Sequence, residues 1–188
     1  NVYFHKLNML TTAYVIRALV RARELVAAGE MQVSRRMERM LTDDNLSVKD
    51  YLALSDSLIY AELSAFVTHP DRVLSKWAGL LASRSGMHKR VRVRNLTEVA
   101  FWGAKSSIES ILSEAGHNPD EDMIVTRVNK EGYRPYNGGI LLENGQDISD
   151  VSPMVASITA PLNDIMLFVP EGCREAAENA INTAMAGE

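Results

Sequence analysis

The densest run of charged side chains in the sequence lies between residues 84 and 94, and it is entirely basic. It contains Arg84, His88, Lys89 and alternating arginines at positions 90, 92 and 94. Alternate residues of an extended chain project from one face, roughly 6–7 Å apart. This spacing suits the phosphates of a nucleotide or of a nucleic-acid backbone. An edge strand protected by its charge would have the same pattern, so both interpretations stay open at this point.

The histidines and the single cysteine give little support for a metal centre or a nucleophilic enzyme. His5, His69, His88 and His117 are widely spaced, and no H-x-x-x-H, H-D or C-x-x-C pair occurs. Cys173 lies at an expected helix start, where a thiol pKa can fall. No accompanying His and Asn arrangement supports a protease, so we interpret Cys173 as a packing or surface residue. A single cysteine also excludes a disulfide scaffold.

The composition is that of a folded domain with an uneven charge distribution. The chain has 188 residues, of which 46% are hydrophobic, and a net charge of −4, which argues against disorder. Residues 1–94 carry 15 basic and 9 acidic side chains, whereas residues 95–188 carry 5 and 15. The asymmetry indicates two modules. Either the modules have different functions, or their opposite charges attract one another. No apolar run reaches the ~18 residues that span a bilayer. We therefore expect a cytoplasmic protein, and the start at Asn1 suggests a piece of a longer chain.

The basic half has helical periodicity. Apolar residues recur every three or four positions from Tyr3 to Leu25, and Gly29 is typical of a helix end. Ser47 and Asp50 have the spacing of a capping box. Pro70 suits the first position of a helix. These signals predict four helices, over residues 3–28, 33–41, 47–68 and 70–86.

In the acidic half the hydrophobic pattern changes from purely helical periodicity to a mixture of strand and helix periodicity. We expect strands at 90–94, 123–128, 140–142 and 165–169, and helices at 104–115, 152–156 and 171–185. The predicted fold class is α+β: a helical N-terminal half followed by a small mixed α/β sandwich with a mostly antiparallel sheet. The predicted domains are residues 1–90 and 91–188. We expect them to pack together, because the link between them is short.

Three segments resemble a known family. They are Val2-Tyr3-Phe4-His5-Lys6, the segment Ser47–Asp56, and the segment Leu74–Arg84 with the strand that follows it. Together they resemble HD-domain phosphohydrolases, and most of all the deoxynucleoside triphosphate (dNTP) triphosphohydrolases. That group includes the enzymes that couple a sterile alpha motif to an HD domain. The C-terminal half resembles the family in element order.

The resemblance implies a role for several residues. In the family, an H…HD…D set holds a divalent metal, and this set is not in the sequence. We therefore expect the chain to be the C-terminal region of such an enzyme, inactive alone, with the metal in an HD core outside it. The tyrosine matching Tyr3 lies beside the substrate sugar. The His-Lys matching His5-Lys6 and the arginine matching Arg84 contact a regulatory nucleotide in allosteric relatives. The expected nucleotide-phosphate ligands are therefore His5, Lys6, Arg84, His88, Lys89 and Arg90. Some relatives also use a lysine in a late strand turn to bind the regulatory nucleotide. This chain has Asn144-Gly145 at that place, and this departure from the family argues against allosteric nucleotide binding.

The sequence thus predicts a fragment of a dNTP phosphohydrolase that supplies part of a substrate wall, nucleotide-phosphate contacts and the contacts of a homo-oligomer. The alternatives are a module that binds single-stranded nucleic acid through residues 84–94, and an oligomerisation domain without a ligand. No membrane partner is expected.

Overall fold

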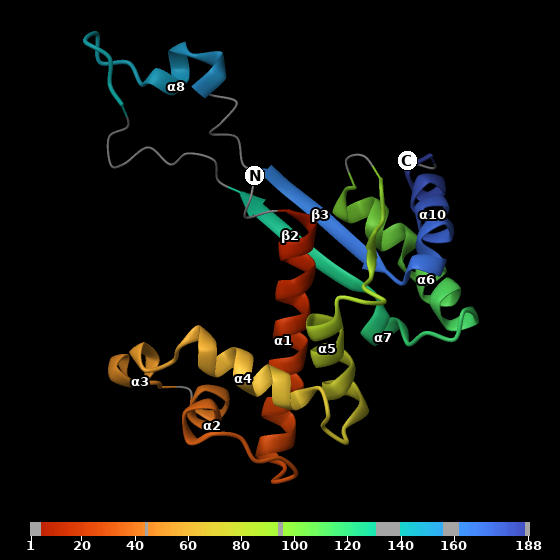
Figure 1. Ribbon diagram of the computed structural model, residues 1–188. Coiled ribbons are helices and arrows are strands. Elements are labelled where there is room, and N and C mark those ends of the chain that lie inside the picture. The colour runs from red at the N-terminus through yellow and green to blue at the C-terminus, as the bar shows by residue number, and fades with distance from the viewer. Residues whose placement is uncertain (1–4, 44, 94–95, 131–139, 156–161, 187–188) are drawn as a thin grey trace. The chain divides into compact units, whose positions relative to one another are not determined.

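The computed structural model describes residues 5–43, 45–93, 96–130, 140–155 and 162–186. The chain divides into two compact units, residues 1–89 and 90–188. The first unit is helical, and the second combines helices with a small sheet (Figure 1). The predicted α+β class is therefore confirmed. No helix within the described ranges is both long enough and apolar enough to cross a membrane.

The helices of the first unit each begin behind a polar residue that caps the helix. The caps are His5, Ser34, Ser47, Ser55 and Asp71, and the side chain of each accepts a hydrogen bond from a backbone N–H in the first turn. The helices are α1 (Lys6–Ala27), α2 (Arg35–Thr42), α3 (Val48–Leu52), α4 (Asp56–Phe66) and α5 (Arg72–Ser83).

The prediction of a single helix over residues 47–68 is wrong. Ser55 is extended, with φ −114° and ψ 152°, and its Oγ accepts from the Leu58 N–H at 3.3 Å. This second cap starts α4, so the helix that Ser47 opens ends at Leu52. The last helix of the unit begins at Arg72 rather than Pro70, because Asp71 is its cap. A short polar side chain competes with helical hydrogen bonds, and here it outweighs the apolar periodicity that continues across the break.

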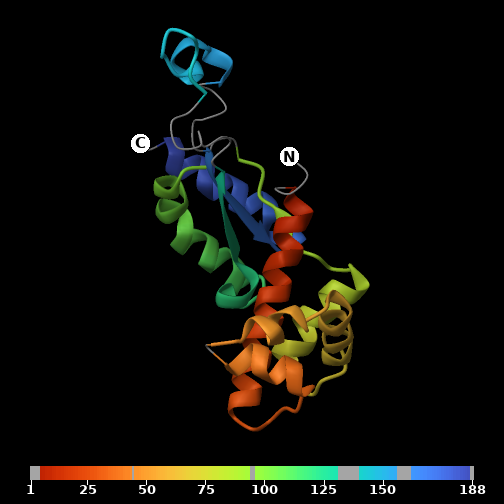
Figure 2. The same cartoon turned by 90° about the vertical axis from the view of Figure 1, so that its left-hand side faces the viewer.

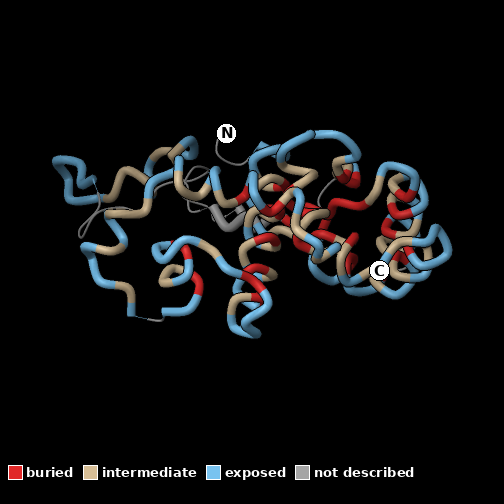
Figure 3. The backbone as a smooth tube through the Cα atoms, turned by 60° about the horizontal axis from the view of Figure 1, so that its bottom comes forward, coloured by how far each residue is buried: buried red, intermediate tan, exposed pale blue. Residues whose placement is uncertain are grey.

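The core of the first unit forms where α1 packs on α5. One face of α1 is buried at intervals of three or four residues, as the sequence predicted, at Leu10, Tyr14, Ala18, Ala22 and Leu25. Figure 3 shows which parts of the chain are buried and which are exposed. Tyr14 contacts Trp77, and Arg21, two turns further along α1, contacts Asp71 at the start of α5. The contacts run in opposite directions along the two helices, so α1 and α5 are antiparallel.

An ion pair joins the middle of α1 to the start of α5. The Arg21 guanidinium donates to Asp71 through Nε at 3.2 Å and through NH2 at 2.7 Å. Asp71 Oδ1 also accepts from the Leu74 N–H at 2.8 Å. Arg21 first, and then the Leu74 N–H, lower the pKa of Asp71 to about 2. The Asp71 side chain is 17% exposed and the Arg21 side chain 33%, so solvent screens the pair in part.

We expect Asp71→Asn to lower the free energy of unfolding near pH 7 by about 2 kcal/mol. Asparagine can also cap a helix, so the loss of unfolding free energy measures the contribution of the Asp71 charge. The folded pKa lies below the unfolded value of ~3.9, so this stability is present above that pH and is lost as the pH falls toward 2. Urea unfolding between pH 2 and 7 measures it, and a double-mutant cycle with Arg21→Gln assigns it to the pair. Asp56→Asn, at the exposed start of α4, is the control. An equal loss in this control would contradict the prediction.

The second unit is built on a three-stranded sheet with the order β1-β3-β2. Its strands are β1 (Lys89–Arg90), β2 (Ile124–Lys130) and β3 (Leu162–Val169). β2 and β3 are antiparallel, with Ile124 opposite Phe168 and Lys130 opposite Leu162. The helices are α6 (Glu98–Glu114), α7 (Pro119–Asp122), α8 (Ile148–Val151) and α10 (Arg174–Ala186), which follows the 3-10 turn η1 (Glu171–Cys173). Figure 2 shows α6 running alongside the sheet.

The core of this unit lies between the sheet and the helices α6 and α10. It includes Ile108 and Leu112 from α6, Leu167 and Val169 from β3, and Ile181 from α10, all of which are fully buried. α6 begins at Glu98, six residues earlier than predicted, because the Thr97 hydroxyl caps it by accepting from the Ala100 N–H at 3.1 Å.

Two of the predicted strands are shorter in the structure. The strand expected at 90–94 is limited to Lys89–Arg90, after which the buried Val91 donates its N–H to the Leu167 carbonyl. The strand expected at 140–142 is a single bridge between Leu141 and Asp147, closed by a turn in which Gly145 has φ +80°. Such short segments form strands only where the edge of a neighbouring strand lies close enough to pair with them. The sequence pattern of a segment does not show whether such an edge is nearby.

Candidate functional site

The predicted phosphate ligands at the start of α1 are exposed. His5 caps the helix, and its Nδ1 accepts from the Leu7 N–H at 3.3 Å. Lys6 is the first helical residue. Tyr3 and Arg94 lie outside the described residues. Because α1 and α5 are antiparallel, the exposed first turn of α1 and the last turn of α5 point toward the same end of the helix pair.

Arg84 ends α5 in an unusual backbone conformation. It has φ 53° and ψ 18°, and among the described residues it is the one non-glycine residue with a positive φ. An L-residue costs roughly 1–2 kcal/mol in this region, which is why helix ends of this type usually carry glycine. The Arg84 side chain is exposed. A strained residue that is not glycine points to a role for its side chain.

His88 lies inside the first unit rather than on an exposed strand face. It is 5% exposed, and its ring stacks on Trp77 with centroids 6.0 Å apart. The Tyr14 hydroxyl lies 2.8 Å from His88 Nδ1 and accepts from the His88 backbone N–H at 2.9 Å. Tyr14, Trp77 and His88 form a cluster that we call the aromatic triad. The prediction that His88 shares a solvated cationic face with Arg90 and Arg92 is wrong, because His88 is buried by Tyr14, 74 residues away in the sequence, and by Trp77.

Two cations cover the indole of the aromatic triad. The Arg17 guanidinium lies 4.8 Å and the Lys76 ammonium 5.0 Å from a Trp77 ring centroid. The triad therefore fixes the chain just after Arg84 and just before β1. Lys89 and Arg90, which form β1, are half-buried. The structure thus anchors the segment that links Arg84 to β1.

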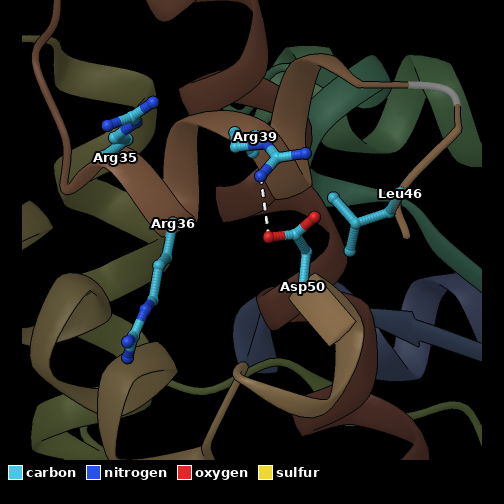
Figure 4. A pocket seen from close by; sticks show the side chains of 5 residues that line it. All are labelled: Arg35, Arg36, Arg39, Leu46 and Asp50. Atoms are coloured by element: carbon cyan, nitrogen blue, oxygen red, sulfur yellow. Dashed lines mark hydrogen bonds and ion pairs between the residues drawn. The ribbon is translucent and has the colours of Figure 1, made fainter. Parts of the chain in front are cut away.

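A second basic site, which the sequence reasoning missed, lies on α2. A pocket of about 270 Å³ is lined by Arg35, Arg36, Arg39, Leu46 and Asp50 (Figure 4). Arg39 donates to Asp50 of α3 at 2.7 Å. The Ser47 hydroxyl first, and Arg39 second, lower the pKa of Asp50, so this carboxylate is ionised at neutral pH. The signal in the sequence was three arginines within five residues at the start of an expected helix.

The described residues offer no metal site. Nowhere in them do three or more His, Cys, Asp or Glu side chains come together as ligands. Cys173 is buried, and burial, followed by the nearby Asp122 carboxylate, raises the pKa of its thiol. This thiol is not an activated nucleophile.

Comparison with known proteins gives a likeness of fold alone. No protein-family model and no curated protein matches the sequence. A solved phosphohydrolase from Bacteroides thetaiotaomicron has a TM-score of 0.64 and 21% identity, over 90% of this chain and 46% of that one. A hypothetical protein from Aquifex aeolicus has a TM-score of 0.53 and 19% identity, over 95% of this chain and 40% of that one. This chain therefore shares a fold with part of each protein, and it spans less than half of their lengths.

Proposed function

We propose that this chain is the C-terminal part of an HD-type, metal-dependent phosphohydrolase that acts on deoxynucleotides. The sequence motifs around His5-Lys6 and Arg84 support this function, and so does the shared fold with a chain named a phosphohydrolase. In this proposal the divalent metal is bound by the HD part of the enzyme, as the resemblance to HD-domain phosphohydrolases implies. This chain contributes Tyr3 beside the sugar, contacts to the nucleotide phosphates, and contacts between subunits of a homo-oligomer.

The observation that carries the proposal is the conformation of Arg84. Its exposed guanidinium is held at a strained helix end. The exposed His5 and Lys6 lie toward the same end of the α1–α5 pair. Arginine binds phosphate through a planar, bidentate fork, and lysine adds a point charge. Lys89 and Arg90, which follow Arg84 in the sequence, are proposed as further phosphate contacts.

We expect Arg84→Ala to weaken dNTP binding about tenfold or more, because each charge-assisted contact contributes about 1.5–3 kcal/mol. Calorimetry at fixed salt measures it, on the wild type and on the variant. Arg84→Lys should recover part of the affinity, because it keeps the charge and loses the fork. Arg72→Ala is the matched control, since Arg72 is also exposed but lies at the opposite end of α5.

A further variant separates the side chain from the backbone. Arg84→Gly should bind dNTP as weakly as Arg84→Ala does. It should nevertheless unfold at a higher temperature than Arg84→Ala, because glycine adopts the positive φ without strain. Equal dNTP affinity in the wild type and Arg84→Ala would contradict the proposal. Salt-dependent binding to single-stranded oligonucleotides without preference for dNTPs would favour a nucleic-acid module instead.

A further inference from the structure

We propose that the α2 pocket is a second anion site, which binds the phosphate groups of a small oligophosphate. The site consists of Arg35, Arg36 and Arg39, with Asp50 as the residue that orients Arg39. It is formed by α2 and α3, whereas His5, Lys6 and Arg84 of the proposed nucleotide site lie at the ends of α1 and α5.

The three arginines share one face of α2. With 3.6 residues per turn, positions 35, 36 and 39 fall within about 100° of one another. Met37 and Leu41 lie on the opposite face and are buried. The side of α2 that is not buried is therefore lined by cations over its first two turns.

These arginines oppose the stability of their own helix. The first turn of a helix carries the positive end of the macrodipole and favours acidic side chains, so cations there are unfavourable. Arg35 and Arg36 are the first two residues of α2. Residues that destabilise their own helix are expected at functional sites, where ligand binding compensates for the lost stability. Glu62 already accepts from the Ser34 N–H at this helix end, so the positive potential that an anion would neutralise comes from the guanidinium groups.

The residues that line the pocket carry a net positive charge, because three are arginines and one is an aspartate. Arg39 pairs with Asp50 at 2.7 Å and lies 3.6 Å from Asp43. Two further carboxylates lie near the start of α2: Glu38 in its first turn, and Glu62, which accepts from the Ser34 N–H at 3.0 Å. Within the described residues, Arg35 and Arg36 form no ion pair. In Figure 4, Arg39 reaches toward Asp50, while Arg35 and Arg36 extend away from that pair.

The size of the pocket indicates the class of ligand. A volume of about 270 Å³ lies near the lower end for ligand sites, which hold drug-sized molecules at roughly 300–1,000 Å³. A chain of two or three phosphates suits this space better than a complete nucleotide. The phosphates come either from a free oligophosphate or from a nucleotide whose base remains in solvent.

The inference is tested by measuring tripolyphosphate binding to the full chain that carries Arg84→Ala. This change weakens the proposed nucleotide site, so the remaining binding reports the α2 pocket. Arg35→Glu/Arg36→Glu in this background should lower the affinity at least tenfold. It should also raise Tm by a degree or more, because acidic residues stabilise a helix start. A loss of binding together with a gain in stability cannot result from misfolding. A dNTP measured in parallel identifies the source of the phosphates: tighter binding than tripolyphosphate indicates a nucleotide, and equal binding indicates a free oligophosphate.

Arg72→Glu is the matched control. Arg72 is an exposed arginine at the first position of α5, as Arg35 is at the first position of α2. We expect this change to raise Tm and to leave tripolyphosphate affinity within twofold. Equal affinity in the α2 double variant, or an equal loss in Arg72→Glu, would overturn the inference. The effect of Arg84→Ala on dNTP binding, measured with the α2 double variant present, shows separately whether the proposed function stands.

Discussion

Truncation of Trp77 to alanine should lower the free energy of unfolding by about 3–5 kcal/mol, as expected for a large buried aromatic side chain. Trp77 is 1% exposed and contacts Tyr14 and His88, with ring centroids 5.5 and 6.0 Å away. Arg17 and Lys76 lie over the indole and would lose their cation–π contacts. Urea unfolding followed by far-ultraviolet circular dichroism measures the loss without depending on tryptophan fluorescence.

Trp102 provides the control within the same chain, which has two tryptophans. Its side chain is 55% exposed on α6, where Lys105 lies 5.4 Å from the ring. We expect Trp102→Ala to cost about 1 kcal/mol or less, because little apolar area is removed from a buried environment. A similar loss in both variants would contradict the burial that distinguishes them.

Removal of the Tyr14 hydroxyl should lower the free energy of unfolding by about 2–4 kcal/mol, although Tyr14→Phe changes almost no volume. The hydroxyl serves both the backbone N–H and Nδ1 of His88, and Tyr14 is 0% exposed. Phenylalanine would leave two polar groups buried without this partner, and each such group costs about 1–3 kcal/mol. Urea unfolding of the two proteins measures the difference.

Tyr60→Phe is the matched control for this change, because Tyr60 is 69% exposed on α4 and its hydroxyl meets solvent. We expect its effect to stay within about 0.5 kcal/mol. If Tyr14→Phe is equally harmless, the Tyr14 hydroxyl does not anchor the segment between α5 and β1, and that part of the description is wrong.

The sequence determined most of the helical structure of this protein. The apolar periodicity of α1 and the caps at Ser47 and Gly29 act within a few residues, so they can be recognised without a fold. The strand signals at 123–128 and 165–169 identified β2 and β3, although both strands extend beyond the predicted ranges, and the change of period predicted the α+β class. The caps at Ser55, Asp71 and Thr97 were not predicted, because the sequence alone does not show whether a short polar side chain will start a helix.

The tertiary structure alone decided the environment of the candidate site. His88 lies in a basic run, and nothing near it in sequence predicts that Tyr14 and Trp77 bury it. The α2 pocket has a similar origin: its arginines are visible in the sequence, but Asp50 reaches Arg39 from another helix. Burial and ion pairing depend on which distant elements approach one another, and that is determined by packing of the whole unit rather than by the propensity of any segment.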